Sequence, residues 1–105
     1  MIARIWQART RGPEDAERYR EVFTTEVLGH LRGLEGFRGA YLLAREHDEA
    51  MEIRTLTLFD SLDAVRRFTG PDHERERVTP AARATLLDSD PAIRHYDVTA
   101  TLPPT

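Results

Sequence analysis

The chain has 105 residues, 40% of them hydrophobic and 31% charged, which predicts a single globular domain over residues 1–105. The formal net charge of −3, with acids interleaved among the arginines, argues against a nucleic-acid-binding protein, which needs a basic face. The absence of cysteine excludes disulfides and Cys-ligated metal sites, and no apolar run approaches the roughly 20 residues of a membrane span.

The first third of the chain predicts a strand, a helix and a second strand. Ile2–Arg9 has the pattern of a strand with bulky members. Pro13 suits the first turn of a helix, which glycines end near residue 33. A second strand is expected near Phe37–Arg45. The apolar stripe of the helix comprises Ala16, Tyr19, Phe23, Val27 and Leu31.

The rest of the chain predicts a hairpin, two helices and a last strand. Residues 47–50 form a polar hairpin tip, followed by a strand near Glu52–Phe59. Asp60 or Ser61 then caps a helix that Gly70 ends. The remaining expected features are a short helix that opens at Thr79 and is ended by residues 88–91, and a strand near Ile93–Leu102.

The expected order β-α-β-β-α-β is that of a ferredoxin-like α+β fold, with helices on one face of a four-stranded antiparallel sheet. Residues 40–44 and 56–59 are apolar on both sides of their strands. Strands of this kind need cover on both faces. Because the helices supply one layer only, we expect a homodimer in which a second sheet covers the other face.

Four segments along nearly the whole chain carry a family resemblance. They are residues 4–6, 36–43, 56–64 and 95–98. In these segments the chain resembles antibiotic biosynthesis monooxygenase-like domains. The resemblance implies a dimeric α+β barrel whose pocket lies between the sheet and the helices of each subunit.

The resemblance also implies a function. Members of this superfamily include cofactor-free monooxygenases that oxidise polycyclic aromatic intermediates, haem-degrading enzymes, and polyketide cyclases on related barrels. We therefore expect a cofactor-independent monooxygenase, or a related cyclase, acting on a polycyclic aromatic or polyketide-like molecule. The alternative is a non-catalytic homodimeric domain that binds a small hydrophobic ligand or has a structural role.

The haem-degrading branch fits this chain poorly. Its Asn-Trp-His triad cannot be carried over, because the chain has no asparagine. The one tryptophan, Trp6, lies on the first strand, and Phe68 stands where that branch has its tryptophan.

Three residues are candidates for catalysis: Trp6, His95 and Arg54. Trp6 would stack on an aromatic substrate, His95 would act as a general base on a phenol or enol, and Arg54 would stabilise an oxyanion. Each also has a structural interpretation, namely core packing for Trp6, a locally satisfied histidine, and an ion pair for Arg54. The carboxylates considered as partners of Arg54 or Arg4 are Glu52, Asp97 and one across the dimer.

Six further residues are candidates for substrate binding. Arg4 is an alternative oxyanion ligand, and His73 follows a helix stop near a possible pocket mouth. His95 and Tyr96 are adjacent on a strand, so only one of them can face the pocket. The set comprises Arg4, Tyr41, Phe59, Phe68, His73 and Tyr96.

The sequence predicts no metal and no bound cofactor. No pair of histidines has the ligand spacing of a helical metal site, and no glycine-rich phosphate loop occurs. All fifteen basic residues are arginine, so there is no lysine for a Schiff base. The N-terminus lacks the pattern of a signal peptide, so we expect a cytoplasmic protein with neither a nucleic acid nor a membrane partner.

Overall fold

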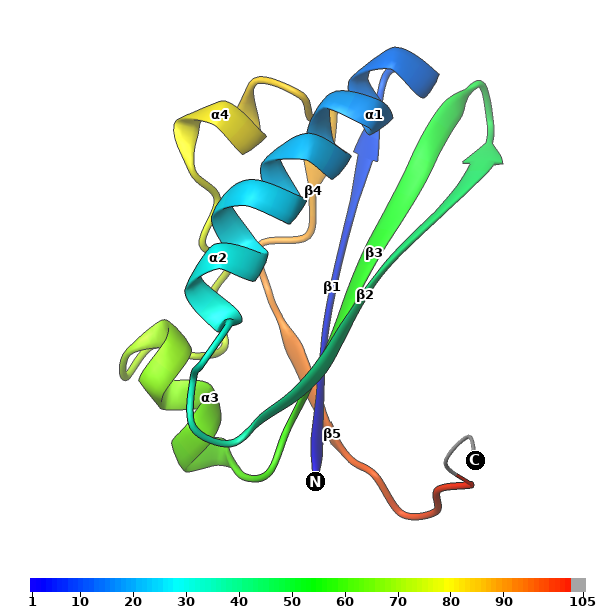
Figure 1. Cartoon of the computed structure of the whole chain (residues 1–105). Coiled ribbons are helices and arrows are strands. Elements are labelled where there is room, and N and C mark those ends of the chain that lie inside the picture. The colour runs from blue at the N-terminus through cyan, green and yellow to red at the C-terminus, as the bar shows by residue number, and fades with distance from the viewer. Residues whose placement is uncertain (103–105) are drawn as a thin grey trace.

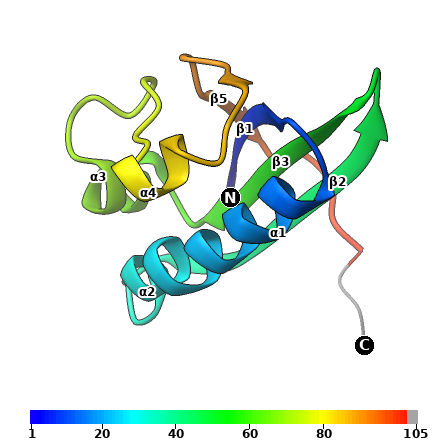
Figure 2. The ribbon, with the colours of Figure 1, turned by 90° about the horizontal axis from the view of Figure 1, so that it is seen from above.

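One antiparallel sheet carries the helices on one of its faces in this computed structural model, which describes residues 1–102 (Figures 1 and 2). The strands are β1 (Ile2–Thr10), β2 (Phe37–His47), β3 (Ala50–Phe59), β4 (Asp88–Ser89) and β5 (Arg94–Asp97). The helices are α1 (Pro13–Val22), the π-helical η1 (Phe23–Val27), α2 (Leu28–Leu31), α3 (Leu62–Thr69) and α4 (Pro80–Arg83).

The sheet order is β2-β3-β1-β4, and β5 also pairs with β1. Every pairing is antiparallel, which confirms the predicted ferredoxin-like α+β fold. The last strand differs from the expectation, because two short strands replace one long strand. Residues 88–89, which were expected only to end the preceding helix, pair with β1 as β4. Pro91 then interrupts the ladder, since proline has no backbone N–H to donate, and β5 covers only Arg94–Asp97.

The hairpin between β2 and β3 is tighter than expected. Its two turn residues, Asp48 and Glu49, both have positive φ, 49° and 62°. A two-residue turn of this kind matches the right-handed twist of the flanking strands. The two strands therefore extend to His47 and from Ala50.

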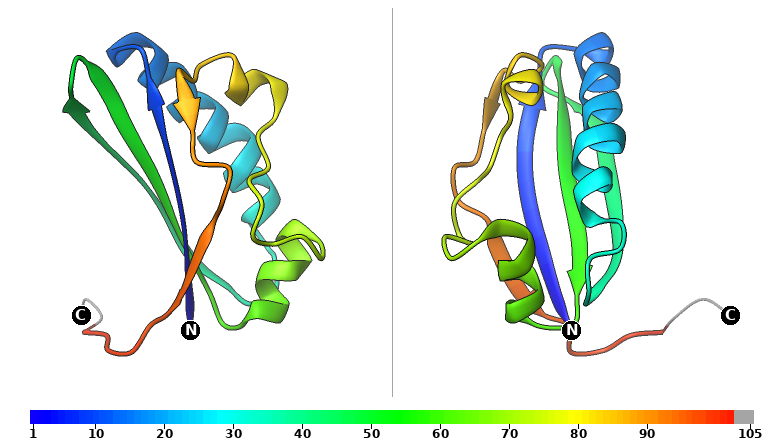
Figure 3. Two further views of the ribbon diagram at one scale, coloured as in Figure 1. Left: turned by 180° about the vertical axis from the view of Figure 1, so that it is seen from behind. Right: turned by 60° about the vertical axis from the view of Figure 1, so that its left-hand side comes forward.

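The two faces of the sheet have different surroundings. On β1, Arg4 and Trp6 face the helices and are buried, and their neighbours on β3 are Thr57 and Thr55. Ile5 points to the opposite face, together with its neighbours on β3 and β2. Seen from behind, β2 and β3 have no helix over them (Figure 3, left). The large side chains left exposed on this open face are Tyr41 (58%), Leu43 (50%) and Tyr96 (51%).

The first helix is continuous but not regular. The expected single α-helix contains the π-helical turn η1 between α1 and α2. The hydroxyl groups of Thr24 and Thr25 donate to the carbonyl oxygens of Arg20 and Glu21, each at 2.8 Å. Such bonds to the residue four positions earlier compete with the helical ladder, which accounts for a local irregularity here.

The position of α3 is set by a cap at its N-terminus and by a close contact along its side. The hydroxyl of Ser61 accepts a hydrogen bond from Ala64 N at 3.2 Å, so Ser61 is the N-cap. Gly36 lies against α3 with φ +88°, and a Cβ there would lie 2.6 Å from the Cβ of Ala64. Only glycine therefore permits this approach of the β2 entry to α3.

Two apolar clusters lie between the sheet and the helices. The first cluster is built around Trp6, Tyr19, Phe23 and Ile53. The second cluster is built around Leu31, Phe59, Ala64 and Val65. Val27 and Leu28 pack against both clusters, so the end of η1 lies where the two meet.

Candidate functional site

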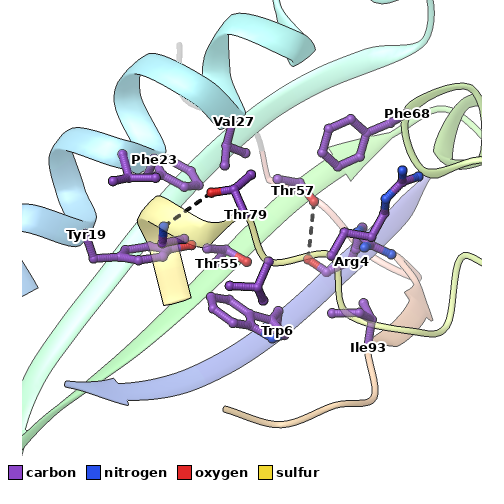
Figure 4. Close-up of a pocket in the computed structure, with 14 residues that line it drawn as sticks. Arg4, Trp6, Tyr19, Phe23, Val27, Thr55, Thr57, Phe68, Thr79 and Ile93 are labelled. Carbon is purple, nitrogen blue, oxygen red and sulfur yellow. Dashed lines mark hydrogen bonds between the residues drawn. The ribbon is translucent and has the colours of Figure 1, made fainter. Parts of the chain in front are cut away.

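A cavity lies between β1 and β3 on one side and α1 and η1 on the other (Figure 4). The segment 70–79, which follows α3, contributes Arg77, Val78 and Thr79 to its lining and is called the closing segment below. The free volume of this cavity is about 80 Å³. The aromatic members of its lining are Trp6, Tyr19, Phe23 and Phe68, the hydroxyl-bearing members are Tyr19, Thr55, Thr57 and Thr79, and the charged members are Arg4 and Arg77.

Arg4 is a buried cation whose partners are all uncharged. It retains 7% of its exposure. One guanidinium nitrogen donates to the carbonyl of His73 at 2.7 Å and also lies 3.1 Å from Nε2 of His95. Its Cζ lies 5.9 Å from the ring centroid of Phe68, within range of a cation–π interaction.

The charge of Arg4 persists in this site. Burial, and secondly the positive charge of Arg77, lowers the pKa of Arg4 to about 10, so the group is still protonated at neutral pH. Among residues 1–102, no carboxylate lies within ion-pair distance of either arginine, in contrast to most other arginines. A buried charge without a counter-ion is costly, and here the His73 carbonyl, the His95 ring and the face of Phe68 offset part of that cost.

His95 lies beside Arg4 and is neutral. A guanidinium can only donate, so Nε2 of His95 accepts from Arg4 and the ring proton is on Nδ1. Burial first, then the charges of Arg4 and His73, lowers the pKa of His95 to about 4. The ring of His73 lies edge-on at 5.2 Å between centroids. His95 is absent from the cavity lining, and its basic nitrogen is already occupied.

The lowered pKa of His95 predicts a pH-dependent stability. An unfolded histidine takes up a proton near pH 6.5, whereas His95 in the folded chain does so near pH 4. Between these values the unfolded state binds more protons, so the free energy of unfolding falls as the pH drops from about 6.5 to 4. Because the ring is partly solvent-screened, we expect a loss of about 1 to 2 kcal/mol across this window. Urea unfolding at pH 7.5 and 5.0 measures it.

His95→Gln is the informative variant, since its amide oxygen can still accept from Arg4 but cannot titrate. Its loss of stability between pH 7.5 and 5.0 should be smaller than that of the wild type. His30→Gln, which changes an exposed residue of α2, serves as the control and should behave as the wild type. Equal pH dependence in the wild type and His95→Gln would contradict the assignment.

Trp6 combines a cavity wall with a fixed ring orientation. Its ring N–H donates to Oε2 of Glu76 at 3.0 Å and to the carbonyl of Asp90 at 3.1 Å. The other carboxylate oxygen of Glu76 accepts from Arg83 at 2.8 Å and from Ser89 at 3.1 Å. Burial alone would raise the pKa of Glu76, but hydrogen bonds from Ser89, Trp6 and Arg83 hold it below its usual value. Trp6 therefore packs in the first cluster, as the structural interpretation has it, and one side of it lines the cavity, while stacking on a substrate stays a prediction.

Tyr19 presents a polar atom to the same space. Burial raises its pKa well above the usual value, so the phenol stays protonated. No side-chain hydrogen bond within the described residues involves its hydroxyl. In Figure 4 the ring of Tyr19 points into the cavity toward Thr55.

Side-chain contacts hold the closing segment in place. The hydroxyl of Thr79 donates to the Glu26 carboxylate of η1 at 2.8 Å and also caps α4. Arg77 donates to the carbonyl of Thr69 at the end of α3. With the Glu76–Trp6 bond, these contacts tie the segment to β1, η1 and α3.

The structure brings some of the predicted site residues together and separates others. Arg4, Trp6 and Phe68 line the cavity, while His95 and His73 lie directly behind Arg4. The other predicted residues lie elsewhere. Arg54, Tyr41 and Tyr96 are on the open face of the sheet, where Arg54 lies 3.5 Å from the Glu52 carboxylate, and Phe59 is fully buried in the second cluster.

Several cavity residues were not predicted as site residues. Tyr19 and Phe23 belong to the predicted helical stripe, which indicates burial but not a cavity. Thr55 and Thr57 alternate along β3 with Arg54, and this alternation is the signal that places them opposite to Arg54. Arg77 lies in a segment without periodicity, so no sequence signal marks it.

Within residues 1–102, no group of three or more His, Cys, Asp or Glu side chains is arranged to hold a metal ion. No helix in this part of the chain has the length and apolar character needed to cross a membrane.

Comparisons with known proteins identify the fold. No family model and no curated sequence matches the chain. SnoaB, a cofactor-independent oxygenase from Streptomyces nogalater, superposes with a TM-score of 0.66 at 21% identity, over 98% of this chain and 97% of its own. The monooxygenase of gene ActVA-Orf6 from Streptomyces coelicolor, in complex with nanaomycin D, gives 0.69 at 18% identity, over 99% and 92%.

A third similar structure comes from the haem-degrading branch. The haem degrader MhuD from Mycobacterium tuberculosis, with two haems in its active site, has a TM-score of 0.64 at 17% identity, over 98% of this chain and 100% of its own. At these identities the likeness establishes the fold, which the resemblance in the sequence had predicted. The chain therefore has the same fold as these two oxygenases and as the haem degrader MhuD.

Proposed function

We propose that this protein is a cofactor-independent monooxygenase that oxidises a polycyclic aromatic molecule with an ionisable phenol or enol. The observation that carries the proposal is Arg4, a protonated guanidinium without a carboxylate partner in the described chain, at the wall of an aromatic cavity. Two structures with the same fold, SnoaB and the ActVA-Orf6 protein, are an oxygenase and a monooxygenase.

Arg4 would act on the charge that develops during the reaction. A phenol or enol that loses its proton places negative charge on oxygen, and a preorganised donor in a water-poor site stabilises that charge. Arg4 uses one guanidinium nitrogen for His73 and His95, so further N–H groups remain for a ligand. His95 then has a positioning role, because it holds the guanidinium from behind.

The reaction needs dioxygen and no metal-bound intermediate. For an anthrone, loss of a proton gives an enolate whose oxygen would receive hydrogen bonds from Arg4. The enolate carbon then donates electrons to O₂ and forms a new C–O bond. When the O–O bond breaks, one oxygen atom remains as the quinone carbonyl, and the other leaves as water with the two hydrogens lost by the reacting carbon, the first of which passes through solvent. The substrate is oxidised and O₂ is reduced, with no other electron source.

The cavity must enlarge to admit such a ring system. Its free space of about 80 Å³ is well below the roughly 300 Å³ at which ligand pockets begin. The closing segment 70–79 pairs through its backbone with residues 91–93, by Glu76 N to Pro91 O at 2.9 Å and Ile93 N to Glu74 O at 2.8 Å. Towards η1 it is held by a side-chain hydrogen bond, from Thr79 to Glu26. We propose that this segment moves outward to admit the substrate and closes again to exclude water.

We further propose that the open face of the sheet pairs with a second copy of the chain. Tyr41, Leu43 and Tyr96 are half-exposed there, and Ile5 and Leu56 share the same face. This face is apolar around Tyr41, Leu56 and Ile5 and charged beyond Leu43, where Arg54 pairs with Glu52. Its apolar part is suited to a matching sheet, and a two-fold dimer supplies one. The pairing would leave the helix-side cavity of each subunit free.

Oxygen consumption by the purified, chelator-treated protein with anthrone tests the proposed function. We expect uptake above the buffer rate, with the quinone as product. Phe68→Leu should lower kcat/KM about tenfold, since the aromatic face that lines the cavity and contacts Arg4 is lost. An oxygen electrode and quinone absorbance provide the two readouts.

Phe37→Leu is the matched control. Both phenylalanines pack on the ring of Phe59, at 5.9 Å for Phe37 and 6.2 Å for Phe68, but only Phe68 lines the cavity. The control should keep the wild-type rate at a similar cost in stability. If neither anthrone nor a dihydroxynaphthalene raises oxygen uptake above buffer, the non-catalytic ligand-binding alternative replaces this proposal.

A further inference from the structure

The two arginines that line the cavity differ in burial, and within residues 1–102 neither has a carboxylate as counter-ion. Arg4 is buried, whereas Arg77 is exposed, yet both side chains line the same cavity. Arg77 reaches the carbonyl of Thr69, which satisfies one of its five N–H groups. The space therefore has one cation inside and one at its solvent side.

Within residues 1–102, most arginines pair with a carboxylate, whereas the two cavity arginines do not. The arginines that pair with a carboxylate are Arg9, Arg18, Arg20, Arg38, Arg45, Arg54, Arg66, Arg75, Arg83 and Arg94. The arginines outside this set are Arg4, Arg11, Arg32, Arg67 and Arg77, and of these only Arg4 and Arg77 line the cavity. Within residues 1–102 the cavity lining contains no acidic side chain. The nearby carboxylates point elsewhere: Glu76 binds Trp6 and Arg83, and Glu26 binds Thr79.

The two cations also act on each other. The charge of Arg77 is the second cause, after burial, of the lowered pKa of Arg4. Without an anion the two groups repel, and an anion in the cavity would remove that cost. Since one enolate oxygen can engage only the inner guanidinium closely, the outer one is left for a second negative group.

We propose that the natural substrate is an aromatic acid, whose carboxylate pairs with Arg77 at the solvent side while its phenol or enol oxygen meets Arg4 inside. This inference rests on the proposed function and narrows its substrate class. Arg77 would then set the orientation of the ring, because a bidentate pair with a carboxylate fixes one end of the molecule.

Binding of anthraquinone-2-carboxylate and of its neutral carboxamide tests the proposal. Trp6 is the only tryptophan and lines the cavity, so quenching of its fluorescence reports occupancy. The wild type should bind the acid at least about tenfold more tightly than the amide, the usual effect of a charge-assisted bond. This preference should shrink as salt is raised.

Arg77→Gln should bring the acid-to-amide preference close to one, and Arg77→Lys should restore part of it. Arg11→Gln removes an exposed arginine that does not line the cavity and should keep the full preference. Equal affinity for acid and amide in the wild type, no quenching by either probe, or an unchanged preference in Arg77→Gln would overturn the inference. Oxygen uptake with the uncharged anthrone tests the proposed function separately, so the two can fail independently.

Discussion

Replacing Arg4 with methionine is expected to lower kcat/KM for anthrone oxidation by about 10² to 10³-fold, the usual effect of losing one donor to an oxyanion. The same change should leave the free energy of unfolding within about 1 kcal/mol of the wild type, since the two lost hydrogen bonds are offset by removal of a buried charge without a counter-ion. Oxygen uptake and urea unfolding of the same preparation measure both.

A large loss of kcat/KM with little change in the free energy of unfolding distinguishes a functional role of Arg4 from a structural one. A purely structural arginine would show the opposite pattern, with lost stability and little change in rate per folded molecule. Arg66→Met is the control, since Arg66 lies exposed on α3 and pairs with Asp63. It should change neither quantity appreciably. An Arg4→Met enzyme with wild-type kcat/KM would remove the central support of the proposed function.

Tyr41→Asp is expected to convert a dimer into a monomer. Tyr41 is 58% exposed in the isolated chain, so its replacement should cost the monomer little. In the proposed dimer the new carboxylate would be buried against an apolar sheet, which would weaken association by at least about a hundredfold. Sedimentation or sizing over a range of protein concentrations gives the dissociation constant.

The matching control places the same charge on another face. Thr24→Asp changes an exposed residue of η1, away from the open face of the sheet, and should leave the dimer intact. A wild-type protein that remains monomeric at all concentrations would show that another molecule, or solvent alone, covers this face. A Tyr41→Asp variant that dimerises normally would exclude the open face as the interface.

Local signals in the sequence were sufficient for the fold. The apolar stripe from Ala16 to Leu31, the Ser61 cap and the polar hairpin at residues 47–50 each depend on neighbours within a few positions. Such signals do not report how strands divide under long-range pairing. Pro91 is a local signal for the gap between β4 and β5, but the pairing of Asp88 and Ser89 with β1 depends on contacts far away in the chain, so β4 was not predicted.

The site was harder to predict because the sequence leaves open which of the two alternating sets of side chains on each strand faces the helices. Arg4 and Arg54 were equivalent candidates from their sequence context, but Arg4 lies on the helix-facing side and Arg54 on the open side. His95 and Tyr96 were separated in the same way, with His95 facing Arg4. Arg4 and Trp6 are two positions apart on one strand, so their side chains lie on the same face of the sheet, and this spacing was the available signal. Arg77 needed the tertiary structure, since a loop without periodicity brings it to the cavity.

The π-helical turn η1 has a consequence for how this helix could have evolved. A π turn carries one residue more than the α-helix around it, and each residue advances an α-helix by about 100°. On either side of this turn, α1 presents Tyr19 to one apolar cluster and α2 presents Leu31 to the other. An insertion or deletion of one residue in 23–27 would rotate one half of the helix by about 100° relative to the other, and so would change the cavity wall relative to the second cluster.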